Sequence, residues 1–156
     1  MFAFTQVHDG IAPNIFTNAG VCELSPLEED ETLLSDDPRI QWRKALWDTG
    51  ATQSCISDRM ANDLSLEIVG FVDISSAVGI HQVPVYCANL VLPNHLVFQE
   101  MELIQFTYTD DDCDLIIGMD IMTQGDLSMT NLEGRTVFSF RIPSLHTVDF
   151  EAEHTL

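Results

Sequence analysis

The stretch Ala45-Leu46-Trp47-Asp48-Thr49-Gly50-Ala51-Thr52 is the part of this sequence that decides the fold. An acid directly follows an apolar run, and a small hydroxyl residue and a glycine come next. The run from Gln41 to Trp47 predicts a strand with a buried end. Gly50 lets the chain reverse sharply with no Cβ in the way, and the Thr49 hydroxyl can hold the turn. Taken alone, Asp-Thr-Gly is more often an ordinary turn in which the carboxylate binds nearby backbone.

A second motif, Leu115-Ile116-Ile117-Gly118-Met119-Asp120, predicts a short buried strand followed by one helical turn over residues 118–123. The two motifs, in this order, resemble the catalytic loop and the supporting strand and helix of retropepsin-like (retroviral-type) aspartic proteases, in particular the bacterial branch. The stretches 125–131 and 136–144 resemble the C-terminal half of bacterial members. The resemblance covers residues 40–144, about two thirds of the chain.

This resemblance implies a role for particular residues. Asp48 corresponds to the catalytic acid, and Thr49, Gly50 and Ala51 complete the active-site loop. The family covers its substrate with a hairpin called the flap, and the matching segment here is Ser75–His81. The flap candidates within it are Val78, Gly79 and Ile80, and the residues expected to support the loop are Ile116, Ile117 and Gly118.

The chemistry of this family needs two aspartates, which share a proton and bind one water between them. This chain has one Asp-Thr-Gly and no Asp-Ser-Gly, so the second carboxylate must be Asp48 of another copy. We therefore expect a homodimeric aspartic endopeptidase with the site on its two-fold axis and no metal or organic cofactor. Ala51 lacks the hydroxyl that would favour the charged carboxylate, so we expect the pair to titrate high and activity in mildly acidic solution.

The charge of the chain limits its partners. The 156 residues include 25 Asp and Glu against 6 Lys and Arg, a formal net charge of −19. Such a surface argues against nucleic acids and anionic membranes, and leaves a peptide or protein substrate and a second copy as the expected partners. Because like charges repel, we expect added salt or lower pH to strengthen the dimer.

Apolar runs and turn residues alternate along the chain and predict an all-β fold. No membrane span or secretory signal is recognisable, so the four cysteines are expected to be reduced thiols in a cytoplasmic protein. One helix is expected at residues 57–64, capped by Ser57, and Pro84 favours an edge strand. The strands are expected at residues 2–7, 15–24, 41–47, 53–56, 68–74, 83–92, 96–106, 114–117, 126–130 and 136–142.

The resemblance implies a closed retropepsin-like β-barrel. Residues 1–39 are expected to form N-terminal strands and an acidic loop (28–37), residues 40–144 the protease domain, and residues 145–156 an acidic tail. Two other functions remain open at this stage. One is a non-catalytic binding or scaffold module with the same fold. The other is a monomeric hydrolase in which a different acid, such as Asp120, partners Asp48.

Overall fold

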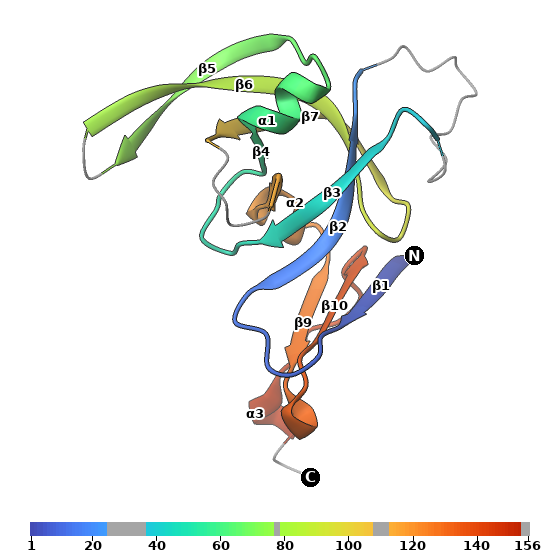
Figure 1. The fold of residues 1–156 in the computed structure, drawn as a ribbon. Coiled ribbons are helices and arrows are strands. Elements are labelled where there is room, and N and C mark those ends of the chain that lie inside the picture. Colours follow the sequence, from blue (N-terminus) through green and yellow to red (C-terminus); the bar gives the residue numbers. More distant parts are fainter. Residues whose placement is uncertain (25–36, 77–78, 108–112, 154–156) are drawn as a thin grey trace.

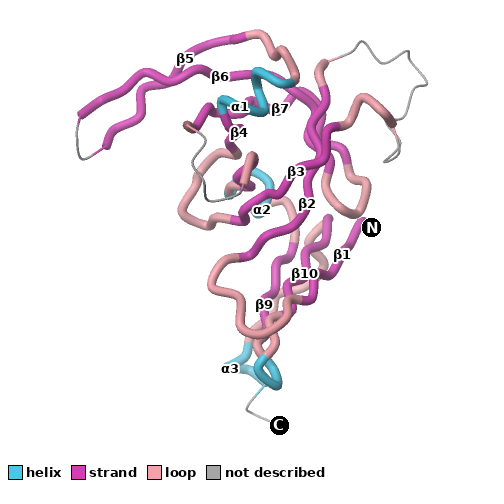
Figure 2. The backbone as a smooth tube through the Cα atoms, in the orientation of Figure 1, coloured by secondary structure: helices cyan, strands magenta, loops and turns pink. Residues whose placement is uncertain are grey.

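A computed structural model describes residues 1–24, 37–76, 79–107 and 113–153 of the chain. Val78 and nearly all of the acidic segment 28–37 lie outside these residues. The described part is mostly β-strand, as Figure 2 shows. Its strands are β1 (Phe2–Val7), β2 (Ile15–Cys22), β3 (Gln41–Trp47), β4 (Cys55–Ser57), β5 (Ile68–Ser76), β6 (Gly79–Val91), β7 (Val97–Phe106), β8 (Leu115–Ile117), β9 (Asp126–Thr130) and β10 (Val137–Ile142). Its helices are α1 (Asp58–Asp63), α2 (Met119–Met122), α3 (Phe150–Glu153) and the 3-10 turn η1 (Leu132–Gly134).

Seven strands form one sheet in the order β2-β3-β8-β4-β7-β6-β5, and β2 also pairs with β6. This extra pairing turns the sheet back on itself as a ring of paired strands, from which β5 and the start of β6 project as an arm (Figure 1). The all-β prediction is confirmed. A closed barrel was expected, and the structure shows a ring of paired strands.

A separate sheet of three strands, β1-β10-β9, lies below the ring in Figure 1. Both of its pairings are antiparallel, with Phe4 opposite Phe140 and Phe140 opposite Leu127. The strands before residue 40 are thus paired with strands after it, because β1 joins β10 and β2 joins β3.

The two sheets meet at Trp47, the residue before Asp48. Its ring lies 4.9 Å from that of Phe138, 5.0 Å from that of Phe140 and 5.9 Å from that of Phe4, centroid to centroid. Its indole N–H donates to the Thr17 hydroxyl at 2.9 Å, so the polar atom of this buried side chain is satisfied. Packing of this kind fixes the end of β3, and therefore fixes where the next residue stands.

Two local predictions can be compared with the structure. Helix α1 is confirmed, because the Ser57 hydroxyl accepts the N–H of Met60 as its N-cap. Pro84 does not lie on an edge strand, since β6 lies between β5 and β7. The β7 pairing begins only at Val85, however, so at Pro84 the strand is paired on one side only, with β5.

Candidate active site

Asp48 stands at the end of β3, beside the end of β8. These two strands run parallel, with Trp47 opposite Ile117, and the Asp48 N–H donates to the Ile117 carbonyl at 3.0 Å. Its carboxylate Oδ1 accepts the Gly50 N–H at 2.8 Å, and its carbonyl accepts the Ala51 N–H at 3.1 Å. Asp48 is half-buried, whereas Thr49 and Gly50 are exposed. The loop therefore holds the carboxylate in one orientation while leaving its surroundings open.

Helix α2 holds the rest of the loop through the backbone. The Met119 N–H donates to the Ala51 carbonyl at 2.8 Å, and the Asp120 N–H donates to the Thr52 carbonyl at 3.2 Å. Gly118 is needed for this approach, since a Cβ there would lie 2.8 Å from the Gln53 carbonyl oxygen. The sequence pointed to Gly118 as a supporting residue, and the structure places it against the loop that begins at Asp48.

A side-chain bridge between Ser54 and Asp120 ties the two motifs together. Ser54 is fully buried, and both its N–H and its hydroxyl donate to the Asp120 carboxylate at 2.8 Å. The same hydroxyl accepts the Gly118 N–H at 3.0 Å. Asp120 also accepts the Ile121 N–H at 2.9 Å, so its carboxylate is occupied by donors within the loop support. This makes Asp120 a structural acceptor and argues against its use as the second acid of a monomeric hydrolase.

The Ser54–Asp120 bridge was not anticipated from the sequence. The signal for it was a hydroxyl residue six positions after Asp48 and an acid two positions after Gly118. Neither residue type is unusual in a loop or in a first helical turn, and only the fold brings them within bonding distance.

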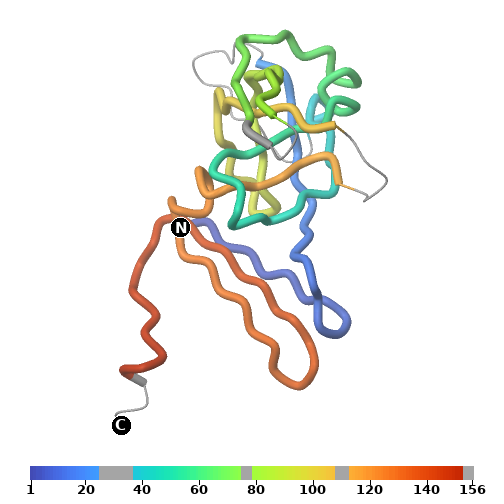
Figure 3. The backbone as a smooth tube through the Cα atoms, turned by 90° about the vertical axis from the view of Figure 1, so that its left-hand side faces the viewer, coloured from blue at the N-terminus to red at the C-terminus, as the bar shows by residue number. Residues whose placement is uncertain are grey.

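The arm formed by β5 and β6 lies above the catalytic loop and on the same side of the molecule in Figures 1 and 3. The segment 75–81, which was expected to be a flap tip, lies at the end of this arm, where Ser76 pairs with Gly79. Gly79 has a φ of +125°, which a residue with a side chain rarely adopts. Ile80 is 73% exposed on the arm.

The two faces of the arm differ in their residues. By the strand register, Phe71 pairs with Pro84, and both lie on the face of β6 that carries Ile80 and the core residue Tyr86. This face continues the core-facing side of β6 outward along the arm, where it leaves Phe71 57% exposed.

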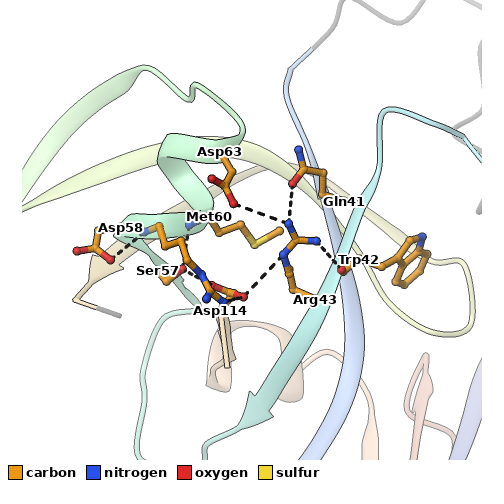
Figure 4. Close-up of polar contacts among 9 residues, drawn as sticks. Gln41, Trp42, Arg43, Ser57, Asp58, Met60, Asp63 and Asp114 are labelled. Carbon is orange, nitrogen blue, oxygen red and sulfur yellow. Dashed lines mark hydrogen bonds and ion pairs between the residues drawn. The ribbon is translucent and has the colours of Figure 1, made fainter. Parts of the chain in front are cut away.

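An ion cluster at the opposite ends of β3 and β8 from Asp48 holds these strands to α1 (Figure 4). The buried Asp114 carboxylate accepts Arg59 at 3.0 and 2.5 Å and the Ser57 hydroxyl at 2.7 Å, and Arg43 lies 3.8 Å away. Arg43 also reaches Asp63 at 3.8 Å. Burial raises the pKa of the Asp114 carboxyl, but the bonds and charges of Arg59, Ser57 and Arg43 outweigh it and hold the pKa below its usual value.

Cys55 opens β4, close to both carboxylates of the site. Burial first, and then the negative charges of Asp120 and Asp48, raise the pKa of the Cys55 thiol to about 11. A thiol of this kind is protonated at neutral pH and is a poor nucleophile. Of the groups beside the loop, Asp48 is therefore the better candidate for chemistry.

No protein-family model matches the sequence, and no curated protein matches it. Among solved structures, a retropepsin-like aspartic protease from Rickettsia conorii is similar, with a TM-score of 0.51 and 11% identity over 88% of this chain and 92% of that chain. The retroviral protease-like domain of Ddi1 from Leishmania major also matches, with a TM-score of 0.38 and 18% identity over 70% of this chain and 90% of that chain. The likeness to the Rickettsia structure shows that this chain has a retropepsin-like fold.

Within the described residues, no helix is long and apolar enough to cross a membrane.

Proposed function

We propose that this protein is an aspartic endopeptidase that hydrolyses peptide bonds as a homodimer, with Asp48 of each copy forming the catalytic pair. The observation that carries the proposal is the setting of Asp48. Its Oδ1 is held by the Gly50 N–H, whereas no group of the described residues bonds Oδ2. Asp48 thus offers one carboxylate oxygen to a water, a substrate or a second carboxylate.

The need for a second copy follows from the surroundings of that carboxylate. Asp120, the acid nearest in the loop support, is fully engaged by Ser54 and Ile121. A single Asp48 cannot act as base toward the water and as acid toward the carbonyl at the same moment. The exposed Thr49 and Gly50 leave a surface on which an identical loop can approach across a two-fold axis.

In the proposed reaction, one Asp48 is ionised and the other protonated, because two adjacent carboxylates do not both ionise. The ionised carboxylate takes a proton from the water, whose oxygen attacks the carbonyl carbon of the peptide. The protonated carboxyl gives its proton to the carbonyl oxygen, which forms a tetrahedral diol. Collapse of the diol breaks the C–N bond as the amine nitrogen receives a proton from the protonated carboxyl, while the other carboxylate takes a proton from a diol hydroxyl. A carboxyl and an amino terminus are released, and the pair again holds one proton.

We expect the arm to contribute to substrate binding. Phe71 and Ile80 lie on the face of the arm that continues from the core residue Tyr86, and they offer exposed apolar surface. An extended peptide running between the arm and Asp48 would bury apolar side chains against them. This favours peptides with apolar residues around the cleaved bond.

Asp48→Asn tests the proposal, because it removes the carboxylate and keeps the shape of the side chain. We expect peptide cleavage to fall by about 100-fold or more, the usual contribution of a general acid or base. Asp9→Asn is the matched control, since it makes the same charge change at an exposed turn. Equal cleavage by the two variants would show that Asp48 is not the catalytic acid, and no cleavage by a folded dimeric wild type would favour a binding or scaffold module.

A further inference from the structure

The core-facing side of the arm carries a single ionisable residue, Asp73. Asp73 on β5 pairs with Gln82 on β6, and because side chains alternate along a strand, Asp73 lies on the same face as Phe71 and Ile80. Along the arm, the pair of Asp73 and Gln82 lies between Phe71 and Ile80, and all four residues are exposed. This face therefore presents two apolar side chains with a carboxylate between them.

The Asp73 carboxylate has no partner among the described residues. Other acids of the chain are held in ion pairs, such as Asp114 with Arg59 at 2.5 Å and Asp126 with Arg141 at 2.7 Å. A carboxylate without a cation of its own chain can accept charge-assisted hydrogen bonds from the cation of a ligand.

The elements around the proposed catalytic site contain acids but no Lys or Arg. No Lys or Arg lies between Lys44 and Arg59, the stretch that includes the catalytic loop. None lies between Arg59 and Arg135, the stretch that includes the arm and α2. Lys44 itself lies over the Phe16 ring at 4.3 Å, and Arg59 binds Asp114. The charge of these elements therefore attracts a cationic peptide.

We propose that Asp73 is a specificity-determining residue, which selects peptides that carry a Lys or Arg beside the apolar residues at the cleaved bond. The inference rests on the proposed function, because it takes the peptide to run between the arm and Asp48. The apolar residues of the peptide pack against Phe71 and Ile80, and its base pairs with the Asp73 carboxylate.

The two-fold symmetry of the proposed dimer extends this preference to both sides of the cleaved bond. Each copy contributes one arm, so one Asp73 lies on either side of the shared site. A base on either side is therefore recognised, and a peptide with one base on each side is cleaved best.

A set of peptides that differ at one position tests the proposal. A peptide with apolar residues at the cleaved bond is made with Lys, Gln or Glu at each flanking position in turn, and kcat/KM is measured at low salt. For at least one position on each side, we expect the wild type to cleave the Lys peptide about tenfold more efficiently than the Glu peptide. Asp73→Asn is expected to remove this preference, and Asp73→Lys to reverse it.

Glu102→Lys is the matched control for the change in net charge. Glu102 is exposed and pairs with Cys87, which alternation places on the opposite face of β6 from Tyr86. The variant changes the charge of the chain as much as Asp73→Lys does, but on the other side of the sheet. It should leave the ratio of Lys-peptide to Glu-peptide cleavage within about twofold of the wild type.

The outcomes separate this inference from the proposed function. Equal cleavage of the Lys and Glu peptides by the wild type would overturn the role of Asp73 and leave the protease function standing. An equal loss of preference in Asp73→Lys and Glu102→Lys would also overturn it, because the preference would then come from the net charge of the chain.

Peptide binding covers the case in which the wild type cleaves none of the peptides. The same peptides are titrated with Asp48→Asn protein, with and without Asp73→Lys, and binding is followed by fluorescence anisotropy. If binding favours the Lys peptide and Asp73→Lys reverses the order, the role of Asp73 stands and the protease function fails. If binding shows no such preference, both fail.

Discussion

Removing the Ser54 hydroxyl is the sharpest probe of how the catalytic loop is held. Ser54→Ala deletes the hydrogen bond to the Asp120 carboxylate (2.8 Å) and leaves the Gly118 N–H without its acceptor. A bond to a charged acceptor is worth about 1.5–3 kcal/mol, and a stranded buried donor costs about 1–3 kcal/mol. The two effects occur at one site and are not fully additive, so we expect the free energy of unfolding to fall by about 3 kcal/mol. This is a large part of the roughly 5–15 kcal/mol by which a typical domain is stable.

Loss of the same hydroxyl should also affect catalysis. Because Gly118 and Asp120 hold the loop that carries Asp48, we expect kcat to fall by about tenfold or more with little change in KM. Urea denaturation followed by tryptophan fluorescence measures the stability, and a peptide cleavage assay measures the kinetics. Ser139→Ala is the control, since its hydroxyl bonds only to the exposed Thr5 hydroxyl among the described residues; it should cost about 0.5 kcal/mol or less. If Ser54→Ala is as mild as Ser139→Ala in both assays, the loop does not depend on this bridge.

Three further predictions concern the ion cluster, the thiol and the surface charge. Because the Asp114 pKa is lowered from 3.8, its contribution to stability is complete above about pH 5 and is lost as the pH falls through the folded pKa. Asp114→Asn should therefore lower the free energy of unfolding at pH 7 by about 1–2 kcal/mol, and by less at low pH. The figure is moderate because Arg59 and Arg43 are partly exposed. An equal loss at both pH values would refute this. Cys55, with its pKa near 11, should react with iodoacetamide at pH 8 far more slowly than a free thiol, and mass spectrometry showing rapid labelling would contradict this. The dissociation constant of the dimer should fall with added salt, because salt screens the repulsion between two acidic chains. If sedimentation gives the same constant at low and high salt, charge repulsion does not limit dimer assembly.

Much of the fold could be predicted because local signals and tertiary structure agree in this chain. The expected strands at 41–47 and 126–130 match β3 and β9, and the remaining strands are found within a few residues of their expected ends. Alternating apolar residues and clear turn residues set these limits. The start of β6 was missed by four residues, because Gly79–Gln82 has no strong strand pattern and becomes a strand by pairing with β5.

The supporting contacts of the site were less predictable than its acid. Asp48 stands out because an acid after a buried strand has few structural uses, and the second motif can be recognised from its own residues. The Ser54–Asp120 bridge joins residues 66 positions apart, and Asp114 joins Ser57 across 57 positions. No sequence periodicity relates such pairs. The place of β1 in the three-stranded sheet was also unforeseen, since its partner β10 comes from the opposite end of the chain.

Mixing active and inactive subunits is the most direct test of the central claim, that two copies share one site. A fixed amount of wild type is titrated with Asp48→Asn protein at concentrations where both are dimeric, and peptide cleavage is measured. If both carboxylates are needed, heterodimers are inactive, and at equal amounts only about a quarter of the dimers cleave peptide. Activity per wild-type chain is expected to fall as the variant is added. Activity that stays proportional to the wild-type chains, whatever the amount of variant, would contradict it.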